Sequence, residues 1–128
     1  IEEWNKISKD YIQSLFDDSA KNFSVSEKNM KIIKEMDEYI QKNFRVSFGN
    51  RTLKQLSLFV PAYMACGGDE LDGIDFIITT KVLRKFFALN LPFLTKELQM
   101  LIAFLDRKFG KGRMKTSIEY LRQLQKTV

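Results

Sequence analysis

The stretch that decides the fold most clearly is residues 69–86, DELDGIDFIITTKVLRKF. Its apolar residues recur at helical spacing, which predicts one buried helical face made of Leu71, Ile74, Ile78, Val82 and Phe86. Acidic residues stand at its beginning and cations near its end, where the helix dipole favours each sign. Charge and periodicity therefore agree on a helix, with Asp69 as its N-cap.

The same spacing continues along the chain on both sides of this stretch. It predicts helices over 3–16, 24–44, 50–64 and 95–109 and a last helix around 118–124. Ser24 and Glu27 have the spacing of a capping box, and Asn50 and Thr95 are the expected N-caps of the third and fifth helices. Pro61 is expected to kink or shorten the third helix. The prediction is an all-α, compact bundle of five or six helices.

The apolar faces of these helices predict the core. Strand-like composition at 58–60 and 77–80 lies within longer helical patterns, so we interpret both segments as helix. Cys66 follows an apolar run and is expected to be a buried free thiol. The expected core consists of Trp4, Ile7, Tyr11, Ile33, Ile40, Leu53, Leu56, Val60, Ile74, Ile78, Val82, Leu101, Leu105 and Leu121.

Length and composition exclude several classes of protein. The 128 residues are 45% hydrophobic, enough for the core of a single domain spanning 1–128. The chain has no histidine and one cysteine, which removes histidine-based catalytic pairs, histidine-containing zinc sites and disulfides. No apolar run is long enough to span a bilayer. The chain begins at Ile1 without a signal-peptide pattern, so we expect a cytoplasmic fragment of a longer protein without membrane contact.

Two motifs that bind phosphate or calcium are absent. The pair Gly110-Lys111 lacks the upstream glycine and the following Ser or Thr of a P-loop. The acidic stretch 68–73 fails the pattern of a calcium loop at both ends. We expect no catalytic residue and no metal site in this chain.

Positive charge is concentrated toward the C-terminus. Residues 1–80 contain 10 Lys or Arg and 13 Asp or Glu, whereas residues 81–128 contain 11 and 3. A basic cluster of this kind favours phosphates, an acidic partner or nucleic acid, and it also fits a solvated helix surface. The candidate basic surface comprises Lys81, Arg84, Lys85, Arg107, Lys108, Lys111, Arg113 and Lys115.

One segment, 47–56, carries a more specific signal. Arg51 stands in the first turn of an expected helix, directly after Gly49, where a cation opposes the helix dipole at a cost of about 0.3–1 kcal/mol. A bound phosphate would reverse that cost, because the guanidinium and the helix start would then face an anion. Arg51 is the candidate phosphate-sensing residue. Gly49 and Asn50 support it, and Lys54, one turn further on, is the second candidate.

This segment resembles the C-terminal helical lid of AAA+ ATPases, where a Gly-x-Arg-x-Leu turn presents the sensor 2 arginine. The chain is more specifically similar to the McrB-like branch, the GTP- or ATP-driven motors related to modified-cytosine restriction systems. The resembling stretches are 2–5, 48–53, 74–86 and 117–121. Arg84 stands where that branch usually has proline.

The resemblance implies a division of labour between parts of a larger protein. The P-loop, the acid that binds Mg²⁺ and sensor 1 would lie upstream in an AAA+ core, which would use ATP or GTP with Mg²⁺. The lid would close over the nucleotide, Arg51 would touch the terminal phosphates, and the motion of the lid would be transmitted to neighbouring ring subunits. A role in restriction or defence and a nuclease partner are further implications. The fragment alone would bind no cofactor and hydrolyse nothing.

Two alternatives remain open at this point. One is a stand-alone helical module that binds a protein partner through an amphipathic groove. The other is a helical nucleic-acid-binding domain that uses the basic C-terminal third.

Overall fold

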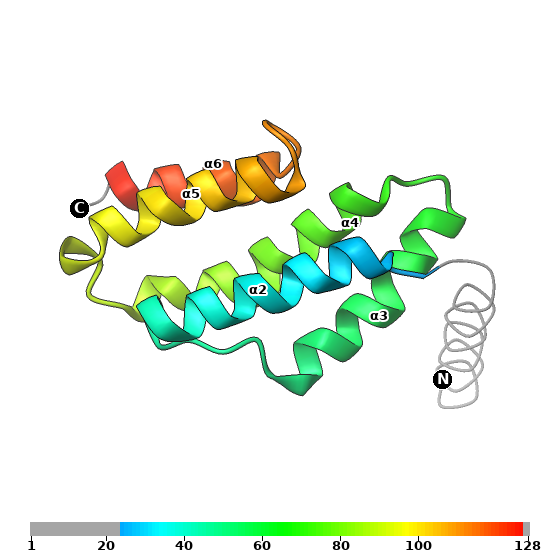
Figure 1. Ribbon diagram of the computed structural model, residues 1–128, viewed down its shortest axis with the longest axis horizontal. Coiled ribbons are helices and arrows are strands. Elements are labelled where there is room, and N and C mark those ends of the chain that lie inside the picture. Colours follow the sequence, from blue (N-terminus) through cyan, green and yellow to red (C-terminus); the bar gives the residue numbers. More distant parts are fainter. Residues whose placement is uncertain (1–23, 127–128) are drawn as a thin grey trace, which may run out of the picture.

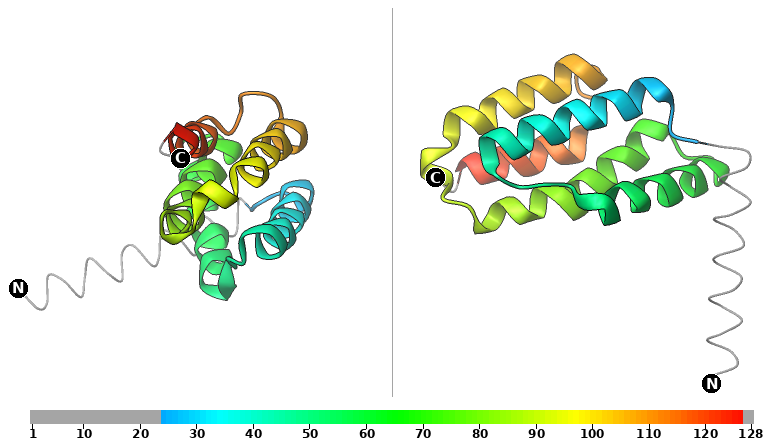
Figure 2. Two further views of the ribbon diagram at one scale, coloured as in Figure 1. Left: turned by 90° about the vertical axis from the view of Figure 1, so that its left-hand side faces the viewer. Right: turned by 60° about the horizontal axis from the view of Figure 1, so that its bottom comes forward.

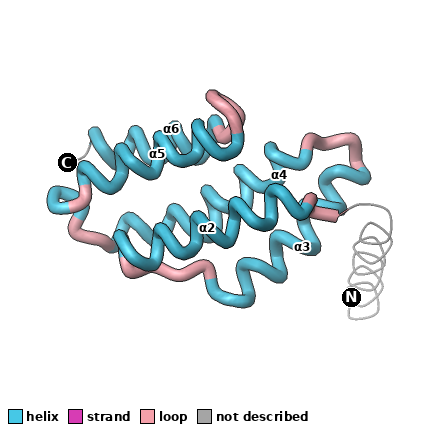
Figure 3. Tube along the Cα trace, viewed as in Figure 1, coloured by secondary structure: helices cyan, strands magenta, loops and turns pink. Residues whose placement is uncertain are grey.

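In the computed structural model, the structure describes residues 24–126. Within that range the regular elements are all helical, which confirms the all-α prediction (Figure 3). The helix expected over 3–16, and with it Trp4, Ile7 and Tyr11, lies outside the described residues. No helix in the described part has the length and apolar character that crossing a bilayer requires. The elements are α2 (Glu27–Phe44), α3 (Gly49–Ala65), α4 (Glu70–Ile77), η1 (Ile78–Val82), η2 (Leu83–Ala88), η3 (Leu91–Phe93), α5 (Thr95–Phe109) and α6 (Lys115–Lys126).

The elements α4, η1 and η2 follow one another as a single rod at the centre of the bundle (Figure 1). The end-on view in Figure 2 shows α3, α2, α5 and α6 arranged around this rod. Helix α3 packs antiparallel against α4, and α5 and α6 form a second hairpin. Helix α6 contacts all three segments of the rod, and α2 contacts α5.

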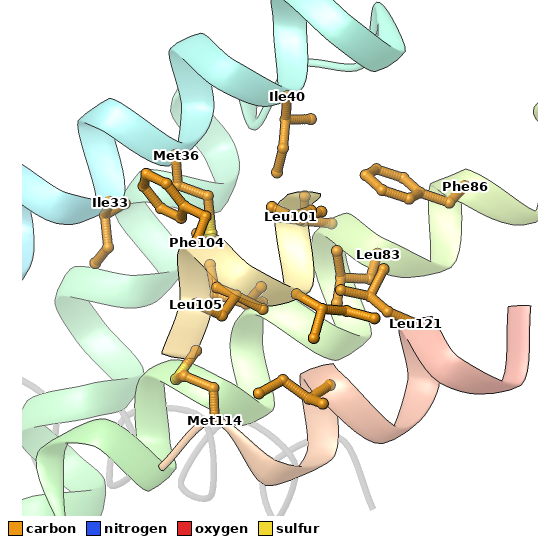
Figure 4. Close-up of a cluster of buried hydrophobic side chains, with 14 of the residues drawn as sticks. Ile33, Met36, Ile40, Leu83, Phe86, Leu101, Phe104, Leu105, Met114 and Leu121 are labelled. Atoms are coloured by element: carbon orange, nitrogen blue, oxygen red, sulfur yellow. The ribbon is translucent and has the colours of Figure 1, made fainter. Parts of the chain in front are cut away.

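The core fills the space between the rod and the surrounding helices (Figure 4). Ten of the expected core residues are buried, namely Ile33, Ile40, Leu56, Val60, Ile74, Ile78, Val82, Leu101, Leu105 and Leu121. Leu53 was predicted to be buried, but it is only half-buried at the edge of the core. The sequence pattern missed Phe48 and Met114, which are fully buried although they lie in the connections before α3 and α6.

Three further sequence predictions about α3 and its end are wrong or incomplete. Tyr63 was expected on the inner face of α3, but its ring is 37% exposed and stacks on Phe59. Cys66 is exposed rather than buried, because it caps the C-terminus of α3 beyond the apolar face. Pro61 does not shorten the helix: it lies inside α3, which continues to Ala65, and it is buried.

The starts of α2, α3 and α5 differ from the sequence predictions. Helix α2 is capped by Ser26, whose hydroxyl accepts from the Asn29 amide at 3.2 Å, and not by Ser24. The carboxylate of Glu70, from the start of α4, accepts from the Ser26 amide at 2.6 Å and takes the part expected of Glu27. Distant residues thus complete caps that a local motif could not reveal.

Helix α3 begins one residue before its expected cap Asn50, and helix α5 begins at its expected cap Thr95. Phe48 is the residue before α3, and its amide donates to Asp37 Oδ1 at 3.1 Å. Because α3 begins at Gly49, Asn50 lies inside the first turn and does not cap it. Thr95 is the first residue of α5 and not its cap. The cap predicted at Asp69 is confirmed, because its side chain accepts from the Leu71 amide.

A buried carboxylate joins α6 to the rod. Asp75 is 4% exposed, and its two oxygens accept from the amides of Thr116 and Ser117 at 2.9 and 2.8 Å. These amides belong to the first turn of α6 and have no partner within that helix. The hydroxyls of Thr79 and Ser117 are 2.9 Å apart, and the Thr79 hydroxyl donates to the Asp75 carbonyl at 2.8 Å. The start of α6 is therefore satisfied by tertiary contacts.

The rod changes its helical type where the sequence predicts one regular helix through Phe86. Residues 78–82 form a π-helix and residues 83–88 a 3₁₀-helix. Apolar residues at 74, 78 and 82 are four apart, and four residues overshoot a turn of α-helix by about 40°. A wider turn reduces that drift and keeps these side chains in the core. The threonine-rich segment 77–80 is helical, as predicted.

We expect the Asp75→Asn variant to lose about 1–3 kcal/mol of unfolding free energy, because an amide offers one acceptor oxygen where two backbone amides, one of them buried, each need one. Asp72→Asn is the matched control on the same helix, since Asp72 is exposed, and it should change stability by no more than about 0.5 kcal/mol. Urea unfolding followed by circular dichroism measures both. Equal losses in the two variants would contradict the capping role of Asp75.

Candidate anion-binding site

A hollow of about 470 Å³ lies where the start of α3 meets the rod. Two elements line it: the first turns of α3 with the residue before them, and the segment of the rod that carries Lys81 and Lys85. The structure therefore brings Arg51 together with two cations that lie thirty or more residues further along the chain. The lining residues are Phe48, Gly49, Arg51, Thr52, Gln55, Lys81 and Lys85.

The local fold holds the start of α3 firmly. Phe48 is fully buried, and its amide is bonded to Asp37 on α2. Gly49 then turns the chain with a φ of 73°, a conformation that glycine adopts without the steric cost of a side chain. Arg51 follows in the first turn of α3 and is exposed. This arrangement matches the glycine turn that the sequence predicted before Arg51.

Arg51 has no carboxylate partner in the described part of the chain, because the salt bridges there involve other residues. The first turn of α3 also contains no acidic residue, so nothing on that turn offsets the positive end of the helix dipole. Asp37 lies nearby but binds the Phe48 amide.

Lys81 and Lys85 lie one turn apart on η1 and η2, and both are exposed. The Lys85 ammonium donates to the Ser47 carbonyl at 3.3 Å, which ties this side chain to the segment before α3. Three cations and a helix start thus surround a hollow whose lining contains no carboxylate. Such a set attracts a phosphate or another multiply charged anion.

The other predicted site residues do not join this hollow. Asn50, Lys54 and Arg84 are exposed outside its lining. Arg51 and Gly49 thus line the hollow, whereas Lys54, the second candidate, lies outside it and Lys81 and Lys85 line it instead. The spacing of four residues between Lys81 and Lys85 indicated that these two side chains lie on the same side of an expected helix. It gave no indication that they lie near Arg51.

The predicted basic surface divides into separate parts. Lys108 pairs with Glu35 at 3.2 Å, and Arg113 pairs with Asp69 at 3.1 Å. The Arg107 guanidinium lies over the Phe104 ring, 5.8 Å from its centre. Carboxylates thus neutralise two of the eight predicted cations.

Lys111 and Lys115 line a second hollow, of about 460 Å³, along α6. Arg122 and Lys126 line it as well, together with the acids Asp106 and Glu119. This surface is basic, with four cations against two carboxylates. It is separate from the hollow beside Arg51, with which it shares no residue.

Other candidate chemistries find no support in residues 24–126. No group of three His, Cys, Asp or Glu side chains there is placed to hold a metal ion. Burial, and after it the negative charge of Glu97, raises the pKa of Tyr39, whose hydroxyl donates to the Glu97 carbonyl at 3.3 Å. This tyrosine lies between α2 and α5 and does not line the hollow beside Arg51.

Comparison of the chain with protein-family models, with curated proteins and with solved structures finds no match.

We expect Arg51→Ala to change the free energy of unfolding by no more than about 0.5 kcal/mol, because Arg51 is an exposed side chain without an ion pair in the described structure. Leu56→Ala, five residues on in the same helix, removes a fully buried side chain and should cost about 2–5 kcal/mol. Thermal and urea unfolding of both variants measure this contrast. A large loss of stability in Arg51→Ala would contradict this expectation and show that Arg51 supports the fold.

Proposed function

We propose that this chain is the helical lid of an AAA+ NTPase of the McrB-like branch, in which Arg51 contacts the terminal phosphates of the nucleotide. The observation that carries the proposal is the hollow at the start of α3, where Arg51, Lys81 and Lys85 converge without a carboxylate in the lining. Cations held in this way on a rigid helix start stabilise the charge of a phosphate group that is being transferred.

The chain supplies one part of such a reaction. Its residues would bind and orient the phosphates, while a P-loop, the acid for Mg²⁺ and the water-positioning group would come from an upstream core that acts on ATP or GTP in the cytoplasm. Lys85 supports the site by its bond to the Ser47 carbonyl. Movement of the lid as the phosphate leaves would act on neighbouring ring subunits.

In the protein that includes the motor core, we expect Arg51→Ala to lower the rate of hydrolysis by about 10- to 1000-fold, the scale of one charge-stabilising contact in a transition state. Lys54→Ala is the matched control, because Lys54 is exposed on the same helix but does not line the hollow, and its rate should stay within about twofold of the wild type. Steady-state NTPase assays measure both rates.

Two outcomes would overturn this proposal. One is an unchanged hydrolysis rate in Arg51→Ala. The other is a coding sequence upstream of Ile1 without G-x-x-x-x-G-K-[ST], since the lid would then have no motor core to close on.

A second candidate function rests on the α6 hollow. Lys111, Lys115, Arg122 and Lys126 form a basic face there that suits a nucleic-acid backbone. If this face binds nucleic acid, the affinity of the chain for random-sequence DNA falls steeply with salt, and Lys115→Glu with Arg122→Glu abolishes binding. The control pair Lys31→Glu with Lys34→Glu, exposed on α2 and outside both hollows, leaves binding intact. Fluorescence anisotropy measures this, and binding without salt dependence would contradict it.

A further inference from the structure

An exposed aromatic groove runs between α3 and α4, and we define it by Leu58, Phe59, Tyr63 and Phe76. The Phe59 ring stacks on Tyr63 and on Phe76, with ring centres 5.8 and 5.3 Å apart. Phe76 is 51% exposed and Tyr63 37% exposed. Hollows of about 270 and 410 Å³ adjoin these rings. Apolar side chains gathered at the surface in this way mark a binding surface, because their exposure to water costs free energy.

The start of the described chain lies close to this groove. Figure 1 shows the beginning of α2 at the same end of the bundle as the turn between α3 and α4. The Ser26 amide donates to Glu70 Oε1, and Glu70 is the first residue of α4. The first described residues therefore lie beside the start of the helix that carries Phe76.

The chain before Ser24 is long enough to reach from the start of α4 to Phe76. From Glu70 to Phe76 the helix rises about 9 Å. The seven residues 17–23 reach about 23–25 Å when extended, which is enough to cross this distance and pass around a helix. Residues 3–16 therefore can reach the groove of their own chain.

The sequence of residues 1–23 matches the groove in chemistry. Trp4, Ile7, Tyr11 and Leu15 have the spacing of one apolar helical face. Residues 1–23 contain three lysines against five carboxylates and are therefore acidic. Lys81 and Lys115 line the hollows beside the groove, and so do Asp72 and Asp75, so these charges balance and the match rests on the apolar face of the segment.

We propose that residues 3–16 dock as an amphipathic helix in the aromatic groove of their own chain, with their apolar face on Phe59, Tyr63 and Phe76. The docked segment covers rings that would otherwise stay exposed to water. This inference does not depend on the proposed function, because it rests on the groove, on the position of Ser24 and on the composition of the segment.

The one tryptophan of the chain, Trp4, reports on this contact directly. In the full chain, Trp4 fluorescence should be shifted to shorter wavelength and be less quenched by iodide than in a free peptide of residues 1–23. Phe76→Asp should remove both differences, because it places a charge in the groove beside an acidic segment. Phe93→Asp is the matched control: Phe93 is 79% exposed on η3 and does not line the groove, so the emission of Trp4 should not change.

Three outcomes would overturn the proposal. The first is Trp4 emission and quenching in the full chain equal to those of the free peptide. The second is an equal response to Phe76→Asp and Phe93→Asp. The third is a blue shift that disappears on dilution, which would mean that the groove holds the segment of a second copy. If Phe76→Asp alters the helical circular dichroism, Tyr63→Ser, which removes a partly exposed ring, takes its place.

Discussion

The bundle depends on the buried carboxylate of Asp75. Its two oxygens bind the first free amides of α6, so the last helix is joined to the central rod by charge-assisted hydrogen bonds. Thr79 and Ser117 complete the polar contacts around it, and no buried side-chain polar atom in the described residues is left without a partner. Without this contact, the buried amide of Ser117 would be an unsatisfied donor in the first turn of α6. The contact therefore determines where α6 begins and which face it presents to the rod.

The same physical solution occurs at two other helix starts. Glu70 accepts from the amide of Ser26, and Asp37 accepts from the amide of Phe48. In each case a carboxylate from a distant segment satisfies the backbone where a helix begins. At α3 the carboxylate of Asp37 binds the amide of Phe48, the residue before the helix, and the first turn itself contains no acidic residue. The positive end of α3 therefore remains available to an external anion beside Arg51.

The hollow beside Arg51 and the aromatic groove are neighbours, because Gln55 and Lys81 line the hollow and also adjoin the apolar side of the groove. Lys81 therefore belongs to the electrostatic surroundings of both surfaces. An acidic segment in the groove would lower the positive potential around Lys81. Helix α3 carries Arg51 at its start and Phe59 and Tyr63 further along, so one rigid element connects the two surfaces.

The sequence by itself determined the helices and the side chains on their inner faces, because helical periodicity depends on residues three and four apart. It also indicated Arg51, since a cation after a glycine turn is a local signal. Only the tertiary structure decided the capping of α6 by Asp75 and the meeting of Arg51 with Lys81 and Lys85. It also decided the burial of Phe48 and Met114 in connections that have no periodicity. These features join segments that are far apart in the chain, and no local pattern records which distant segment will supply the partner.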